Sequence, residues 1–198
     1  MIIRSAEFVT SVADKSRIKS DLPEIAFVGR SNVGKSSFIN CLTQRNKLAK
    51  ASSEPGRTRL INYFAINGAC YFVDLPGYGF ARVSDAEKDK WSDLIEGYLL
   101  NSRELRNVFV IMDVRHPAGE LDKVMIEFLN HYRIGFTVIA TKIDKVKKSQ
   151  LPRYIKALSE SLMIPAANIY PVSSESKEGR EKVLDRLDEL LALPPRQI

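Results

Sequence analysis

The sequence is poor in cysteine and has no long apolar run. Its 198 residues include two cysteines, Cys41 and Cys70, which lack the paired spacing of a zinc site or a disulfide framework. No apolar stretch approaches the ~20 residues needed to cross a bilayer. Residues 1–12 lack the basic-then-apolar order of a secretory signal, and residues 193–198 contain no cysteine that could be prenylated. We therefore expect a cytoplasmic protein that makes no membrane contact.

The length predicts one domain, and the charge is unevenly placed. We expect an N-terminal extension over residues 1–22, one domain over residues 23–194, a short tail over residues 195–198, and a monomer. Residues 1–60 hold 11 Lys and Arg against 5 Asp and Glu, which accounts for the net charge of +6. Such an asymmetry favours a polyanionic partner such as RNA, although a solvated basic face gives the same pattern.

Short apolar runs alternate with amphipathic segments along the chain. Unbroken runs are typical of strands buried on both faces of a parallel sheet, and they occupy residues 25–28, 108–112, 136–140 and 169–172. Apolar side chains recur at helical spacing over residues 91–99 and 183–191. Strands that alternate with helices predict an α/β sandwich.

One pair of strands is expected to run antiparallel. Residues 60–66 and 69–73 flank Asn67-Gly68, and this dipeptide predicts a hairpin because a type I′ turn needs two positive φ angles. The predicted fold is therefore a three-layer α/β sandwich. Its sheet is expected to be mainly parallel and six-stranded, with one antiparallel hairpin edge.

A glycine-rich motif joins the first buried strand to the next helix. It reads G-x-x-x-x-G-K-S, the pattern of a P-loop, so we expect the α/β sandwich to be of the P-loop NTPase type. The glycines let the backbone wrap around phosphate, and the N-terminus of the following helix favours an anion. We expect Lys35 to reach the β- and γ-phosphates and Ser36 to ligate Mg²⁺. The predicted phosphate-binding residues are Gly29, Arg30, Ser31, Asn32, Val33, Gly34, Lys35, Ser36 and Ser37.

Two further segments are expected to meet the γ-phosphate. Asp74-Leu75-Pro76-Gly77 follows the second hairpin strand, where the Asp could hold a metal-bound water and the Gly77 amide could contact phosphate. The polar segment 45–57 precedes the hairpin, and loops of this length usually carry function.

At the end of that loop we predict Gly56, Arg57 and Thr58 at the nucleotide. The Thr58 hydroxyl would complete the Mg²⁺ shell only when the γ-phosphate is present. Ser52 and Ser53 compete for this role, but Thr58 has the better distance to the following strand. Lys35, Thr58 and Gly77 are the candidate catalytic residues, and Ser36 and Thr58 are the candidate metal ligands.

Two later motifs follow buried strands and predict guanine recognition. Thr141-Lys142-Ile143-Asp144 resembles the [NT]-K-x-D motif of GTPases. Its Asp can accept hydrogen bonds from guanine N1–H and the 2-amino group, and adenine lacks both donors. Ser173-Ser174-Glu175 resembles the fifth GTPase motif, [ST]-[AS]-x, whose backbone amide meets guanine O6. The predicted ligands are therefore GTP or GDP with Mg²⁺.

The strings between these motifs resemble one family. PGRT stands before LINYF, DLPGYG follows the hairpin, and Asp113-Val114-Arg115-His116-Pro117 lies further along the chain. Over nearly the whole chain this combination resembles the EngB (YihA or YsxC) ribosome-assembly GTPases of bacteria, which are of the Era-like class. The resemblance implies a switch in large ribosomal subunit assembly, linked to cell division and septation. The implied partner is a precursor of the large subunit, contacted through rRNA or a ribosomal protein.

Three points remain open in the sequence. A small signalling GTPase acting on protein partners and a P-loop nucleotide kinase are the competing functions, and the motif at residues 141–144 weighs against the kinase. Tyr78 stands where many GTPases have a Gln that positions the attacking water, so we expect slow intrinsic hydrolysis. Asn32 matches an asparagine that helps hold K⁺ in some related GTPases, or it simply tolerates a positive φ.

Overall fold

The computed structural model describes residues 1–12, 21–49, 60–78 and 85–198, with side chains described from residue 93 onward in the last range. The strands are β1 (Ala6–Val12), β2 (Glu24–Gly29), β3 (Ile61–Ile66), β4 (Cys70–Asp74), β5 (Leu105–Asp113), β6 (Phe136–Thr141) and β7 (Ile169–Pro171). The helices are α1 (Lys35–Thr43), α2 (Asp85–Asn101), α3 (Glu120–His131), α4 (Leu151–Leu162) and α5 (Arg180–Leu191). Short 3₁₀ turns occupy Ile143–Lys145, Lys148–Gln150 and Ala166–Asn168.

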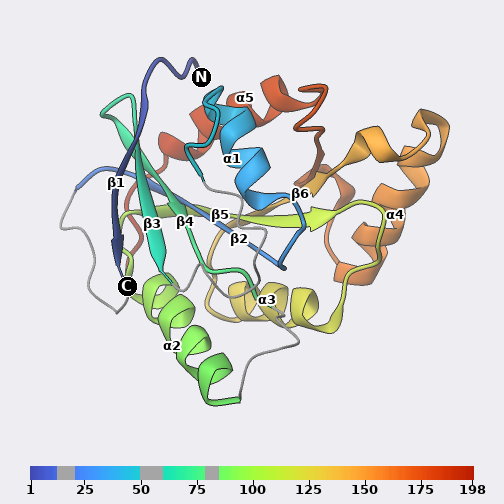
Figure 1. Ribbon diagram of the computed structural model, residues 1–198. Coiled ribbons are helices and arrows are strands. Elements are labelled where there is room, and N and C mark those ends of the chain that lie inside the picture. The colour runs from blue at the N-terminus through green and yellow to red at the C-terminus, as the bar shows by residue number, and fades with distance from the viewer. Residues whose placement is uncertain (13–20, 50–59, 79–84) are drawn as a thin grey trace.

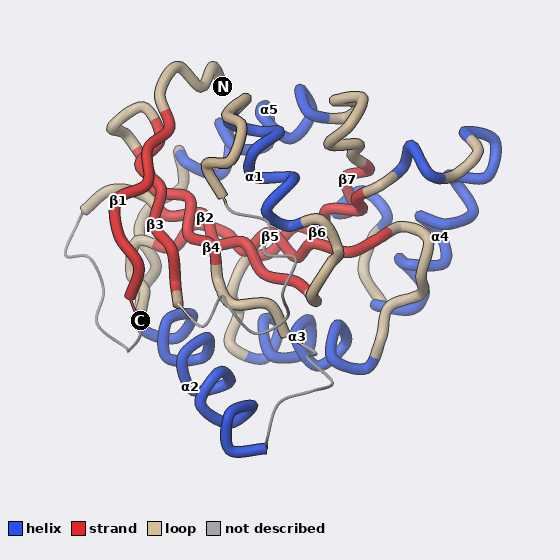
Figure 2. The backbone as a smooth tube through the Cα atoms, viewed as in Figure 1, coloured by secondary structure: helices blue, strands red, loops and turns tan. Residues whose placement is uncertain are grey.

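The strands form one sheet in the order β1-β3-β4-β2-β5-β6-β7, between two layers of helices (Figures 1 and 2). β2, β4, β5, β6 and β7 run parallel, whereas β3 pairs antiparallel with both β1 and β4. Every residue of β2 and β5 is buried, as expected for central strands covered on both faces. The predicted α/β sandwich with a mainly parallel sheet is confirmed.

Each face of the sheet has its own hydrophobic core. Phe38 of α1 and Leu187 of α5 pack on one face, whereas Leu94 of α2, Ile126 of α3 and Leu158 of α4 pack on the other. Both cysteines are buried free thiols, and burial raises the pKa of Cys70 to about 12. No helix within the described ranges combines the length and the apolar character needed to span a bilayer.

The hairpin is confirmed at the predicted turn. Asn67 and Gly68 have φ angles of 53° and 62°, and the Ala69 amide donates to the Ile66 carbonyl at 2.9 Å. The Asn67 side chain also accepts from the Arg4 and Ser5 amides, so the turn holds the start of the chain against the sheet.

The sheet has one strand more than the six predicted. β1 lies within the segment expected to be an extension, and it pairs with β3 at the edge of the sheet. Its register shifts between Phe8 and Thr10, and Phe8 and Val9 are both largely exposed. A bulge interrupts the alternation of buried and exposed side chains, and for this reason the strand has no clear signal in the sequence.

The topology gathers the motifs at one place. In a parallel sheet the carboxyl ends of neighbouring strands share an edge, and ligands bind at that edge. The P-loop follows β2, Asp113 ends β5, Thr141 ends β6, and Ser173 comes shortly after β7.

Candidate functional site

The P-loop, residues 29–36, has a backbone that few sequences can adopt. A Cβ atom on Gly29 would lie 2.5 Å from the Ile111 carbonyl oxygen of β5, which is too close for any residue but glycine. Asn32 and Gly34 have φ angles of 66° and 100°, and α1 begins directly afterwards with Lys35. The loop therefore ends at a helix N-terminus, where unpaired N–H groups favour an anion.

Lys35 is held at the end of β4. Its amino group makes an ion pair with the buried Asp74 carboxylate and donates to the Leu75 carbonyl at 2.6 Å. Ser31 Oγ is buried and has no hydrogen-bond partner among the described groups. A buried hydroxyl of this kind is satisfied when a polar ligand binds, so the loop fits a phosphate-bearing molecule.

The segment that follows β4 lies directly against the P-loop. The Ser31 amide donates to the Tyr78 carbonyl at 3.3 Å, and the Tyr78 amide donates to the Gly29 carbonyl at 3.2 Å. A Cβ atom on Gly77 would stand 3.3 Å from the same Gly29 carbonyl, so the close approach leaves little room for a side chain. The structure thus brings Asp74, Leu75, Pro76 and Gly77 beside the P-loop, as the sequence predicts.

Tyr78 directs its side chain toward α3. Its hydroxyl donates to Asp122 at 2.8 Å, and Arg30 of the P-loop lies 4.0 Å from the same carboxylate. Burial, followed by the charge of Asp122, raises the pKa of Tyr78 well above its ordinary value. The Asp122 carboxylate also accepts from the Gly119 amide, which caps α3. The sequence did not predict this link between Tyr78 and α3.

The TKID segment, residues 141–144, contacts the P-loop through two side chains. Thr141 Oγ1 lies 2.6 Å from the Val33 carbonyl, and it is buried. Lys142 has a φ of 62° and donates from Nζ to the Asn32 carbonyl at 2.7 Å. Ile143 is buried beneath the segment. The aliphatic part of Lys142 passes near Gly34, because a Cβ there would lie 3.7 Å from Lys142 Cε.

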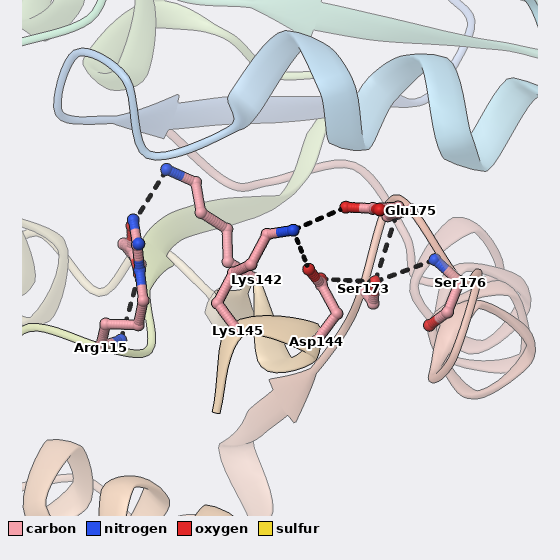
Figure 3. Close-up of polar contacts among 8 residues, drawn as sticks. Arg115, Lys142, Asp144, Lys145, Ser173, Glu175 and Ser176 are labelled. Atoms are coloured by element: carbon pink, nitrogen blue, oxygen red, sulfur yellow. Dashed lines mark hydrogen bonds and ion pairs between the residues drawn. The ribbon is translucent and has the colours of Figure 1, made fainter. Parts of the chain in front are cut away.

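Asp144 is fixed by the loop after β7 (Figure 3). Ser173 Oγ donates to Asp144 Oδ1 at 2.6 Å and accepts from the Glu175 and Ser176 amides at 3.2 and 3.0 Å. Lys145 bridges Asp144 and Glu175, with N···O distances of 3.1 and 2.9 Å. The hydrogen bond from Ser173, followed by that from Lys145, lowers the pKa of Asp144. The carboxylate is therefore ionised and held as an acceptor.

The predicted site also gains a buried carboxylate. Asp113 ends β5, pairs with Lys142 at 3.0 Å, and accepts from Nε and Nη2 of Arg115 at 2.9 and 2.7 Å. Burial of Asp113 disfavours its charge, but the hydrogen bonds from Arg115 and Lys142 outweigh burial and hold its pKa well below the usual range. An acidic residue at the carboxyl end of an apolar central strand was the available signal for this role.

Three further predicted residues lie in the first turn of α1 or in the loop after β7. Ser36 is half-buried and Ser37 exposed in the first turn of α1, and Ser174 is half-buried beside Ser173. Gly56, Arg57 and Thr58 lie outside the described residues. A hollow of about 300 Å³ flanks the P-loop, and its walls include Asn32, Asp113 and Lys142.

Known proteins resemble this chain over most of its length. The profile of the family described as 50S ribosome-binding GTPase matches residues 24–142, more than half of the chain. A probable GTP-binding protein EngB from Heliobacterium modesticaldum is 46% identical over 190 residues, which cover 95% of this chain and 93% of the relative. The corresponding protein of Clostridium acetobutylicum is 47% identical over 189 residues, or 94% of each chain.

A solved structure agrees with the fold. The crystal structure of a probable GTP-binding protein EngB superimposes with a TM-score of 0.71 at 24% identity, and covers 85% of this chain and 98% of that one. The P-loop, the TKID segment and the loop after β7 meet at one edge of a P-loop GTPase fold, and the sequence relatives extend over almost the whole length. The chain therefore belongs to the EngB family of GTP-binding proteins.

Proposed function

We propose that this protein is a GTP-dependent switch in the assembly of the large ribosomal subunit, with a link to normal cell division and septation. The observation that carries the guanine specificity is the Asp144 carboxylate, which Ser173 holds ionised at 2.6 Å beside the P-loop. The ribosomal part is supported by the description of the matching family as 50S ribosome-binding GTPases. No described feature favours the alternative of a signalling GTPase acting on protein partners.

The proposed nucleotide contacts follow the chain. The P-loop amides and Lys35 would hold the phosphates, Gly77 would meet the γ-phosphate, and Asp144 would accept from the guanine N1–H and 2-amino groups. Lys35 is paired with Asp74, so binding would exchange that partner for phosphate oxygens. We assign the GTPase domain to residues 23–194, with residues 1–22 as an extension and residues 195–198 as a tail.

Magnesium is part of the proposal. Among the described residues, no three or more His, Cys, Asp or Glu side chains cluster as a metal site. In P-loop NTPases the Ser or Thr hydroxyl that follows the P-loop lysine holds Mg²⁺ together with phosphate oxygens. Ser36 and Thr58 would supply the hydroxyls, and the ion would offset negative charge on the phosphates. Ser36→Ala should weaken Mg²⁺-dependent binding of both GDP and GTP, whereas Thr58→Ala should affect only GTP.

Slow intrinsic hydrolysis is the expected enzymatic behaviour. Tyr78 has no carboxamide with which to orient a water, and its hydroxyl is occupied by Asp122. Asn32 is a candidate ligand for K⁺, which would add positive charge near the phosphates, although its φ of 66° also suits Asn for backbone reasons alone. Faster hydrolysis in K⁺ than in Na⁺ at matched ionic strength, lost in Asn32→Ala, would support K⁺. Equal wild-type rates would remove K⁺ from the proposal.

The ribosomal partner is tested by co-sedimentation of the purified monomer with large ribosomal subunits and their precursors. The protein is proposed to act in the cytoplasm, so physiological salt is the reference condition. Binding should be strongest with a non-hydrolysable GTP analogue and weaker with GDP or without nucleotide. Equal or absent binding in all three states would contradict a ribosomal switch. A wild-type protein that prefers ATP over GTP in a competition assay would contradict the nucleotide assignment separately.

A further inference from the structure

A hollow lies on the far side of the β5–α3 connection from the P-loop. It encloses about 340 Å³, which is within the range of small-ligand sites. Pro117 and Leu158 form part of its apolar wall, and Arg115, Arg153 and Tyr154 place polar or aromatic groups along it. We call it the α4 groove, because α4 forms one side and stands at the margin of the molecule in Figure 1. No step proposed above uses it.

The groove is basic, because its lining contains Arg115 and Arg153 and no Asp or Glu. The segment 145–159 beside it contains five Lys and Arg and no Asp or Glu, but Lys145 pairs with Asp144 and Glu175, and Lys156 pairs with Glu160. Lys147 and Arg153 are exposed and have no ion-pair partner within the described ranges. Lys148 is 3.8 Å from Glu178, but both side chains are exposed, and such pairs contribute little. The opposite wall adds Arg115, whose charge is paired with Asp113, so the positive charge without a carboxylate partner in the described ranges comes from Arg153 and the nearby Lys147.

Arg115 connects the groove with the nucleotide site. Arg115 lines the groove, and its guanidinium binds Asp113, which in turn binds Lys142. Lys142 also donates to the P-loop carbonyl of Asn32. One buried carboxylate thus stands between two cations, which leaves a net positive charge. A molecule that contacts Arg115 would be linked through Asp113 to Lys142 of the TKID segment.

We propose that the α4 groove binds a single-stranded segment of RNA, with a base stacked on Tyr154 and phosphates contacted by Arg153, Lys147 and Arg115. Bases stack on aromatic rings, and basic side chains follow the phosphate backbone, in proteins that bind single strands. An acidic peptide without aromatic residues would satisfy the charge but offers no flat ring for the apolar hollow. The identity of the strand as RNA rests on the ribosomal partner proposed above.

The test uses the full-length protein and a fluorescein-labelled ten-nucleotide uridine RNA, followed by fluorescence anisotropy. Arg153→Gln should weaken binding several-fold and reduce the slope of log affinity against log salt by about 0.7. Tyr154→Leu keeps an apolar contact with the core but removes the ring, and should weaken binding by about tenfold. Tyr154→Phe keeps the aromatic ring and should bind the RNA as the wild type does.

Lys182→Gln is the matched control. Lys182 is exposed on α5 in the opposite helical layer, so the same loss of one charge should leave RNA affinity within twofold. Thermal unfolding and GDP affinity of each variant confirm that it is folded. If Arg153→Gln and Tyr154→Leu bind the RNA as Lys182→Gln does, the proposal is wrong.

Two further experiments identify the molecule that binds in the α4 groove. If the groove variants lose binding to labelled poly-L-glutamate and not to RNA, an acidic protein segment is the ligand and the proposal is overturned. Co-sedimentation with ribosomal particles separates the RNA-binding proposal from the ribosomal function. If the wild type binds the RNA through the groove but binds no particle, only the ribosomal function is contradicted. Loss of both RNA and particle binding in Arg153→Gln and Tyr154→Leu would support both.

Discussion

Replacement of Ser173 by alanine tests how the guanine site is built. The Ser173 side chain is completely buried, donates to Asp144 at 2.6 Å, and accepts from two amides of its own loop. A hydrogen bond to a charged group contributes about 1.5–3 kcal/mol. Because Asp144 is partly exposed, water can replace part of the lost hydrogen bond, so we expect a loss at the lower end of this energy range. GDP affinity should fall about tenfold, since 1.4 kcal/mol corresponds to that factor.

The pH dependence of GDP binding gives a second measure of the same contact. Guanine needs the ionised Asp144, and the folded protein holds the pKa of this carboxyl below its ordinary value, chiefly through Ser173. Wild-type affinity should therefore persist as the pH falls to that ordinary value and decline only below it. In Ser173→Ala the decline should begin at a higher pH.

Isothermal titration calorimetry with GDP at several pH values measures both effects. Ser174→Ala is the matched control, because Ser174 makes no side-chain hydrogen bond in the described part of the chain, and its affinity should stay within twofold of wild type. An affinity of Ser173→Ala within twofold of wild type, with a superimposable pH profile, would refute the account of Asp144.

Two other substitutions are expected to affect the stability of the protein to very different degrees. Gly29→Ala should unfold or severely destabilise the protein, because its Cβ would lie 2.5 Å from the Ile111 carbonyl oxygen and neither the P-loop backbone nor the β5 backbone can move away. A melting temperature close to that of the wild type would contradict this expectation. Tyr78→Phe removes the hydrogen bond to the buried Asp122 carboxylate and should cost about 1.5–3 kcal/mol of unfolding free energy in urea titration. Its GTP hydrolysis rate should change less than threefold, because the hydroxyl faces α3; a tenfold loss would place Tyr78 in the chemistry.

The elements with strong local signals were predictable from the sequence. The buried runs of β2, β5 and β6 are short and apolar, and Asn67-Gly68 fixes a hairpin through backbone geometry alone. The P-loop was recognisable because its chemistry needs glycine, lysine and serine at fixed spacing. By contrast, β1 depends on pairing with β3 and contains a bulge, so its burial pattern does not alternate.

The contacts within the site depend on which strands are neighbours. Asp113 meets Lys142 because β5 and β6 pair with Asp113 opposite Thr141. Ser173 meets Asp144 because β7 adjoins β6, and no local pattern records that pairing. The motifs therefore identified the residues, whereas the partners that orient and ionise them came from the tertiary structure. Lys145 also bridges Asp144 and Glu175 and so joins the same two loops.

The central claim is that Asp144 selects guanine, and Asp144→Asn tests it most directly. An asparagine amide can donate to the carbonyl that xanthine has in place of the guanine 2-amino group. GDP affinity should fall about 100-fold through the loss of two hydrogen bonds to a charged acceptor, and xanthosine diphosphate should become the preferred ligand. Competition of both diphosphates against a fluorescent guanine nucleotide, with a fluorescent xanthine nucleotide as the second probe, measures the preference. Unchanged GDP affinity and no gain for the xanthine nucleotide would contradict the account.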